Sequence, residues 1–150
     1  DFTTLDASIN RTQGLGKGWS LFGAASTQYA FTPLLSPEEC GYGGKDFGRA
    51  FDPSELTGDS CVSVSGEVRF DPTIPNNPLT QTQLYGFVDY GKVFRIAPSA
   101  GTPTSNDGAS AGAGIRLGNE HFTTDLSAAK PLFGRVDDNW RFFLTASAKY

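Results

Sequence analysis

Few of the residue types that carry out covalent or metal chemistry occur in this 150-residue chain. It holds two cysteines, Cys40 and Cys61, and a single histidine, His121. Two thiols and one imidazole cannot by themselves fill the four ligand positions of a structural zinc site. His121 falls in an expected turn, where the sequence places no partners for a catalytic triad. The glycines of segment 14–18 lack the spacing of a phosphate-binding loop. We therefore expect no catalytic residue, no metal site and no cofactor.

The two cysteines leave two possibilities open. They do not form a C-x-x-C pair, which would indicate a redox or zinc motif. A disulfide between Cys40 and Cys61 would suit an oxidising compartment, and two unrelated free thiols are the alternative. If the bond forms, it closes a long loop and contributes about 3 kcal/mol by the chain-entropy model.

Composition favours strands and turns over helices. The net charge of -4 and the pI of about 4.8 give no basic face for nucleic acid. Aromatic residues make up 13% of the chain, with 18 glycines and 9 prolines, a mixture typical of strands and tight turns. No apolar run approaches the roughly 18–20 residues of a membrane helix. The mean hydropathy of -0.28 still fits a membrane barrel, whose inward residues are polar.

Alternation with a period of two is the dominant pattern, and the last segment shows it best. In residues 140–150 one face carries only apolar or aromatic side chains, while the other is nearly all polar. Because successive strand residues point to opposite faces, such a segment has one apolar and one polar side. The same pattern predicts seven strands, at residues 2–12, 19–31, 61–70, 83–94, 108–117, 121–130 and 140–150.

The connection at residues 32–60 has no strong periodicity and is much longer than a usual loop. Seven strands also leave two unpaired edges, whereas bacterial membrane barrels close and have even strand numbers. The chain starts on a strand without Met or a signal peptide. We therefore expect its amino terminus to be a cut and further strands to precede Asp1.

Several motifs together resemble a known family. Residues 28–39 precede Gly43-Gly44, which are followed by Gly48 and the tripeptide Arg49-Ala50-Phe51. Segments 65–70, 86–91 and 129–132 follow in family order, and the chain ends on Tyr150 after alternating apolar residues. This series is similar to two-partner secretion transporters, the haemolysin activator and filamentous haemagglutinin transporter type. The family tripeptide has Gly where this chain has Ala50, which we expect to affect the loop backbone, since Ala tolerates positive φ poorly.

The resemblance implies an all-β fold, the carboxy-terminal part of an antiparallel transmembrane β-barrel with about seven of sixteen strands. Residues 1–150 would form one unit in the bacterial outer membrane, with the loop at about 32–60 inserted into the lumen. Its function would be to translocate a large secreted partner of adhesin or cytolysin type. Outer-membrane lipid and the barrel-assembly machinery would be further partners, and nucleic acid would not.

The resemblance also implies a site. Arg49 of the loop would pair inside the barrel with Asp89 of the strand motif Phe87-x-Asp89-x-Gly91, and Glu67 would be a second acceptor. Phe51 and the glycines Gly43, Gly44 and Gly48 complete the loop motif. The apolar row of the last strand would be the terminal assembly signal: Phe142, Leu144, Ala146, Ala148 and Tyr150.

Three other functions remain open at this point. A barrel-assembly factor of the same superfamily would share the barrel and the loop. A soluble all-β binding module would pack its apolar strand faces against each other. An outer-membrane enzyme would need a nucleophile and a base, for which His121 is the only candidate of the usual kind.

Overall fold

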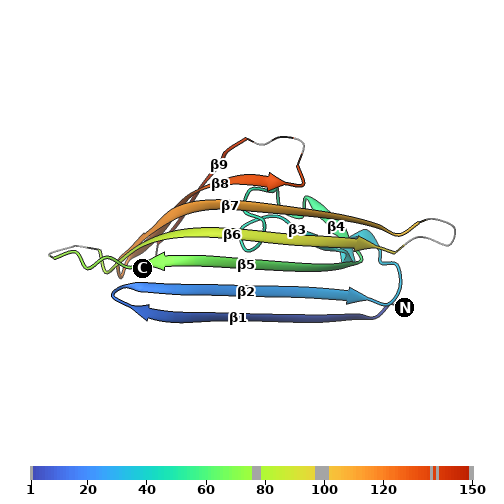
Figure 1. Cartoon of the computed structure of the whole chain (residues 1–150), viewed down its shortest axis with the longest axis horizontal. Coiled ribbons are helices and arrows are strands. Elements are labelled where there is room, and N and C mark those ends of the chain that lie inside the picture. Colours follow the sequence, from blue (N-terminus) through green and yellow to red (C-terminus); the bar gives the residue numbers. More distant parts are fainter. Residues whose placement is uncertain (1, 76–78, 97–101, 136, 138, 149–150) are drawn as a thin grey trace.

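The structure is a computed structural model that describes residues 2–75, 79–96, 102–135, 137 and 139–148. Seven long strands form one antiparallel sheet in the order β1-β2-β5-β6-β7-β8-β9 (Figure 1). The expected all-β antiparallel architecture is confirmed, and each expected strand segment is present. The strands are β1 (Thr4–Gly16), β2 (Trp19–Ala30), β5 (Ser60–Phe70), β6 (Gln81–Arg95), β7 (Thr104–Gly118), β8 (Phe122–Phe133) and β9 (Arg141–Ala148).

Several strands are longer than the alternation indicated. β1 continues past residue 12 to Gly16, with a bulge between Gly14 and Gly16, and positive φ angles at Gly16, Lys17 and Gly18 then close the turn. β7 begins at Thr104, four residues before the expected strand at 108–117, because Thr104 pairs with Arg95 of β6. Pairing with a neighbouring strand thus extends segments whose own residue types favour turns.

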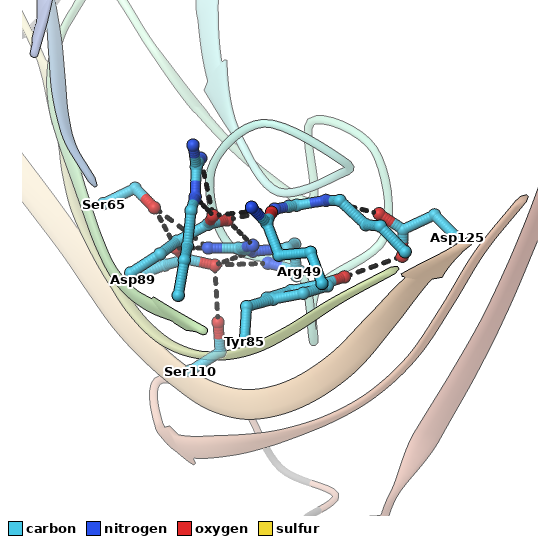
Figure 2. Close-up of polar contacts among 10 residues, drawn as sticks. Arg49, Ser65, Tyr85, Asp89, Ser110 and Asp125 are labelled. Atoms are coloured by element: carbon cyan, nitrogen blue, oxygen red, sulfur yellow. Dashed lines mark hydrogen bonds and ion pairs between the residues drawn. The ribbon is translucent and has the colours of Figure 1, made fainter. Parts of the chain in front are cut away.

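The two faces of the sheet differ in chemistry. On one face of β5 and β6 the side chains are mostly polar or aromatic and buried, as at Ser65, Glu67 and Asp89. The opposite face of the sheet carries mostly apolar side chains, among them Val88, 58% exposed, and Phe142 of β9, 76% exposed. The sheet curves so that the buried set lies on its concave side (Figure 2). A large apolar convex face is therefore left uncovered by the described part of the chain.

The connection between β2 and β5 folds back over the concave face. It contains a short 3-10 helix, η1 (Ser36–Glu38), and a two-stranded sheet of β3 (Cys40–Tyr42) and β4 (Leu56–Gly58). β3 and β4 both contact β6, and Figure 1 shows them lying across the central strands. Within the described residues, no helix is long and apolar enough to cross a membrane. The core lies between this connection and the sheet, and it comprises Tyr42, Ala50, Phe51, Tyr85, Phe87, Val93 and Ala129.

Glycines on the concave face make room for the rings of that core. A Cβ added at Gly91 of β6 would lie 2.0 Å from Cδ2 of Tyr42, and one at Gly108 of β7 would lie 2.5 Å from Cζ of Phe51. The two rings also meet edge to face, with centroids 5.1 Å apart. The connection can therefore lie flat on the sheet only because these strand positions have no side chain.

This close approach gives a prediction for the variant Gly91→Val. The new side chain would overlap the Tyr42 ring, so we expect the connection to be displaced and the free energy of unfolding to fall by about 1–3 kcal/mol, the usual cost of overpacking. Limited proteolysis of residues 40–58 measures the displacement. Gly86→Ala is the matched control on the same strand, because its Cβ would meet only the backbone oxygen of Gly112, at 3.8 Å. Equal cleavage of the two variants would contradict the prediction.

Candidate functional site

Arg49, near the middle of the long connection, lies buried on the concave face of the sheet. Its Nε and Nη2 donate to the two carboxylate oxygens of Asp89, at 3.0 and 2.8 Å. Its Nη1 donates to Glu67 Oε1 at 2.5 Å, and its backbone N–H also donates to Asp89. The guanidinium stacks on the Phe87 ring, with Cζ 3.5 Å from the centroid. One face of the guanidinium and most of its donors are thus used to hold the connection, and Figure 2 shows its contact with Asp89.

Both carboxylate oxygens of Asp89 accept hydrogen bonds in this site. Its Oδ1 also accepts from Ser65 Oγ at 2.7 Å, and its Oδ2 accepts from Ser110 Oγ at 3.3 Å. The residue is 2% exposed. Ser65 of β5 and Ser110 of β7 therefore hold the Asp89 carboxylate from the strands on both sides of β6.

Glu67 extends the site into a network across four strands. Besides Arg49, it accepts from Arg69 of its own strand at 2.7 Å and from Arg116 of β7 at 3.2 Å. Arg116 also pairs with Asp125 of β8 at 3.0 Å. The network therefore contains three arginines and three carboxylates, and its formal charges cancel: Arg49, Arg69 and Arg116 against Glu67, Asp89 and Asp125.

The guanidinium groups of this network lie over the faces of aromatic rings. Arg116 lies over the Tyr85 ring, with Cζ 3.8 Å from the centroid, and the Tyr85 hydroxyl donates to Asp125 at 2.7 Å. Arg69 lies over the Phe22 ring at 4.1 Å. Contact with a ring face favours a cation that has lost part of its water. The rings therefore help to keep the guanidinium groups oriented along the sheet.

The charge on Arg49 is stabilised by its partners despite burial. Burial opposes the charged form, but hydrogen bonds to Asp89 and Glu67 outweigh that effect and raise the pKa of Arg49 above its ordinary value. Removing one member of such a group leaves an unpaired buried charge, which costs far more than the intact pair contributes. The network therefore specifies one position for the connection rather than simply adding stability.

The backbone around Arg49 depends on the loop glycines. Gly43, Gly44 and Gly48 all have positive φ, at 125°, 111° and 76°. A Cβ at Gly43 would lie 2.1 Å from the Asp52 carbonyl oxygen. Ala50 is completely buried and does not have positive φ. The expected effect of Ala in place of the family glycine on the loop backbone stays a prediction, and in this chain the position does not adopt a left-handed conformation.

The ends of the connection are tied to the rim of the sheet. Cys40 and Cys61 form a disulfide, with Cα atoms 6.2 Å apart. Asp59 accepts backbone N–H groups of Leu34 and Ile96, both at 2.6 Å. The disulfide and this carboxylate fix where the connection leaves and rejoins the sheet, so that any movement is confined to residues between them.

A second ionic contact holds the far side of the connection. Asp52 pairs with Arg141 of β9, and Glu55 pairs with Arg135, which follows β8. Asp52 is largely exposed, with its side chain at 61%, and hydrogen bonding from Arg141 lowers the pKa of Asp52. Exposed ion pairs contribute little to stability. This contact, defined by Asp52, Glu55, Arg135 and Arg141, is named the outer latch, and its Asp52–Arg141 pair is more exposed than the buried network.

A cavity of about 620 Å³ lies between the connection and the concave face. Its lining includes Arg49, Glu67, Arg116 and Arg141, together with small polar residues of β1 and β2 such as Asn10 and Ser26. Within the described residues, no group of three or more His, Cys, Asp and Glu side chains is placed to hold a metal ion. The arrangement can guide and orient a polar chain, and its charged groups are occupied with one another.

The structure thus brings together the loop and strand residues named from the sequence. Arg49 meets Asp89 and Glu67, Phe87 lies beneath the guanidinium, and Gly91 lies beneath Tyr42. The sequence analysis missed Tyr42, Arg69, Arg116, Asp125 and the outer latch as site residues. Arg69, Arg116 and Asp125 fall on the polar faces of their strands, and this parity is the signal that could have found them. The latch lies between segments distant in sequence, and no local pattern indicates it.

The terminal strand presents its apolar row on the convex face. Leu126 of β8 pairs with Leu144, and Ala128 pairs with Phe142. Ala146 and Ala148 follow on the same side, while Tyr150 lies outside the described residues. Recognition of this row by the assembly machinery remains a prediction. His121 donates its backbone N–H to Asn119 Oδ1 in the turn before β8.

Comparisons with known proteins found one family match and one similar solved structure. A family model described as haemolysin secretion/activation protein ShlB/FhaC/HecB matches residues 1–117. The fold is similar to the solved structure of CdiB from Acinetobacter baumannii, with a TM-score of 0.70 and 24% sequence identity. That likeness covers 95% of this chain and 25% of the CdiB chain, so the sequence spans about a quarter of that protein's length. No curated protein matches the chain.

The buried network predicts a large effect for Arg49→Ala in the full-length protein. Asp89 and Glu67 would lose their main partner on the connection, so we expect the free energy of unfolding to fall by about 3–5 kcal/mol. Arg49→Lys should restore only part of this, because an ammonium cannot make the two-pronged contact or stack on Phe87. Denaturant unfolding measures both changes.

Arg95→Ala is the control for that comparison. Arg95 of β6 contacts the same connection at the rim of the sheet, where its side chain, 52% exposed, pairs with Glu39 and donates to Thr57. Because this contact is exposed, its removal should cost no more than about 1 kcal/mol. Equal losses for Arg49→Ala and Arg95→Ala would show that the buried network does not hold the connection.

The outer latch predicts a pH dependence. A carboxylate whose pKa is lowered by folding adds stability above its unfolded pKa, and this stability is lost as pH falls through the lower folded value. The ordinary pKa of the Asp52 carboxyl is 3.8, and folding lowers it. The outer latch should therefore be unchanged between about pH 8 and 5 and should weaken only below about pH 4. Hydrogen exchange of residues 50–56 measures this, and Arg141→Gln should remove the transition. Loosening near neutral pH would contradict the assignment.

Proposed function

The chain belongs to the haemolysin secretion/activation protein family ShlB/FhaC/HecB, and on that basis we propose that it forms part of the pore through which a large partner polypeptide is exported. Its place is the bacterial outer membrane. The seven-stranded sheet is the carboxy-terminal portion of a β-barrel with about sixteen strands. The connection at about 32–60 lies within the lumen of that barrel.

The observation that carries the proposal is the burial of Arg49 on the concave face. A loop arginine that is paired with Asp89 and Glu67 of neighbouring strands requires a polar, enclosed interior. The convex face has the opposite character, with exposed Val64, Val88 and Leu126. This division is expected where one side of a sheet faces hydrocarbon and the other faces a water-filled channel.

The polar lumen suits an extended polypeptide. An unfolded chain exposes one amide donor and one carbonyl acceptor per residue, and all of them need hydrogen-bond partners or water. Small polar residues such as Ser8, Asn10 and Ser26 line the cavity beside the connection. Such a surface can accept many sequences without holding any of them tightly, which export of a long adhesin or cytolysin requires.

The connection would then act as a gate whose contacts with the sheet differ in strength. The disulfide between Cys40 and Cys61 keeps its end at the rim, the buried network holds its centre, and the outer latch holds its far side. Opening would release the latch first, since exposed ion pairs are weakest. Asp89 and Glu67 would then have to replace their hydrogen bonds from Arg49 by hydrogen bonds from water or from the substrate.

A barrel-assembly factor of the same superfamily is the second candidate. It would use the same barrel and loop, and the match to the secretion family favours export. A soluble binding module would bury the apolar strand faces, whereas Phe142 and Leu144 are 76% and 70% exposed. We propose no enzymatic step, because export of an unfolded chain needs a path and a gate rather than bond cleavage.

Secretion by the full-length protein tests the proposal. The transporter is co-expressed with a candidate partner, a large adhesin- or cytolysin-type protein, and the partner is measured in the medium. Wild type should secrete the partner, and Arg49→Ala should reduce secretion at least about tenfold, which corresponds to 1.4 kcal/mol. Arg95→Ala is the control and should secrete normally.

Each variant must first be shown to reach the outer membrane as a folded barrel, by its heat-dependent mobility in gels. Normal secretion by cells that lack the transporter would overturn the proposed function. Restored insertion of other outer-membrane proteins, with no effect on the partner, would favour the assembly factor instead.

A further inference from the structure

The space above three glycines on the convex face of the sheet is not filled by side chains of the described residues. Gly23 of β2 pairs directly with Gly66 of β5, and Gly86 of β6 pairs with Val68 of β5. A Cβ at Gly23 would meet nothing within 4 Å, and one at Gly66 would meet only Val88 Cγ2, at 3.9 Å. By contrast, the concave-face glycines Gly91 and Gly108 are covered by rings. Glycine inside a strand costs stability and often marks the close approach of a ligand.

These glycines form a shallow groove. The space above them measures about 610 Å³, and it is flanked by the apolar side chains Leu21, Val68 and Val88. The groove opens outward from the sheet, on the face that the proposed function places against lipid. Its shape and apolar flanks fit a hydrocarbon chain.

A cation lies at one border of this groove. Arg11 of β1 pairs in register with Gly23, so its side chain belongs to the convex face. Its Nη2 donates to Gln13 Oε1 at 2.8 Å, which directs the guanidinium toward the β1–β2 turn. In the part of the chain that the structure describes, no carboxylate forms an ion pair with Arg11, and four of its five N–H donors remain for other acceptors.

The depth of Arg11 makes an uncompensated charge unfavourable. Arg11 precedes Gly16, the last residue of β1, by five positions. At about 3.3 Å per residue and a tilt of about 45°, its Cα lies roughly 12 Å in depth from that end. If the apolar band, about 25 Å tall, begins near this end of the strand, Arg11 lies inside it. A charge there is expected to reach toward the interface or to draw a polar headgroup inward.

We propose that the groove and Arg11 form a binding site for one phospholipid of the periplasmic leaflet. The lipid phosphate would accept hydrogen bonds from the Arg11 guanidinium, with Gln13 beside it, and one acyl chain would lie over Gly23, Gly66 and Gly86. The short β1–β2 turn lies at the opposite end of the sheet from the long connection (Figure 1). In the proposed barrel this end is periplasmic, where the outer membrane carries phospholipid. The inference rests on the proposed function for this orientation.

Charge and shape together favour this occupant over a protein. A guanidinium recognises phosphate through paired donors, and the flanks of the groove are almost entirely apolar. A protein segment in the groove would have to satisfy its own backbone groups in a lipid environment, which an acyl chain need not do.

Native mass spectrometry of the full-length protein in mild detergent tests the site. Dioleoyl phosphatidylglycerol is added in steps, and the population with one retained lipid is measured. Wild type should retain one lipid, whereas Arg11→Gln and Gly66→Val should each bind about tenfold more weakly. Arg95→Gln, at the other end of the sheet, is the matched charge control and should bind like wild type.

The two single variants separate the parts of the site. Arg11→Gln removes the phosphate contact, and Gly66→Val fills the groove without a clash with the sheet. Dioleoylglycerol, which has the acyl chains but no phosphate, should bind wild type no better than it binds Arg11→Gln. Heat-dependent gel mobility confirms that each variant is folded.

Several results would overturn the site. Equal retention of phosphatidylglycerol by wild type and Arg11→Gln would do so, as would stronger retention of lipopolysaccharide than of phosphatidylglycerol. Those results leave secretion of the partner intact. Failure of the proposed function would look different: wild type would dissolve without detergent and retain no lipid at all.

Discussion

A buried guanidinium that must not be left unpaired is the constraint on which the rest of this structure depends. Arg49 reaches the sheet from a connection of nearly thirty residues, and its charge is balanced by Asp89 and Glu67. Desolvation opposes placing any of these charges at this position alone, so the three groups are stable only together. The position of the connection, the polarity of the concave face and the serines around Asp89 all follow from that requirement. A hydrophobic contact could also hold the connection, but charged groups that leave the sheet regain the hydration that they lost on burial.

The two faces of the curved sheet have opposite chemistry, one polar and one apolar. This is possible because successive side chains of a strand point to opposite faces. On the concave side, arginines lie over rings and carboxylates bridge strands, while glycines admit Tyr42 and Phe51 of the connection. On the convex side, the same strands expose aliphatic residues, with open glycines at Gly23 and Gly66. The glycines thus have opposite uses on the two faces. On one face they receive the chain's own loop, and on the other they leave space for a molecule from outside.

Much of this arrangement could be predicted from the sequence, because side-chain alternation is a local property. The seven strands, the parity of Glu67 and Asp89 and the length of the connection all depend on residues close together in the chain. The pairing of Arg49 came from family resemblance rather than from spacing. Strand ends were less predictable, since the early start of β7 at Thr104 depends on its register with β6. The short strands β3 and β4 were missed, because three-residue strands carry no periodicity. The outer latch and the role of Gly91 beneath Tyr42 depend on contacts between distant segments, which one sequence does not reveal.

A double-mutant cycle on Arg49 and Asp89 tests the central claim most directly. Unfolding free energies of the full-length protein in bilayers are measured for wild type, Arg49→Ala, Asp89→Ala and the double variant. If the two groups hold the connection together inside the barrel, the double variant loses much less stability than the sum of the single variants. The expected coupling is about 1–3 kcal/mol. Additive losses, with a coupling near zero, would mean that the two side chains do not interact in the membrane-embedded protein, and that some other contact holds the connection in place.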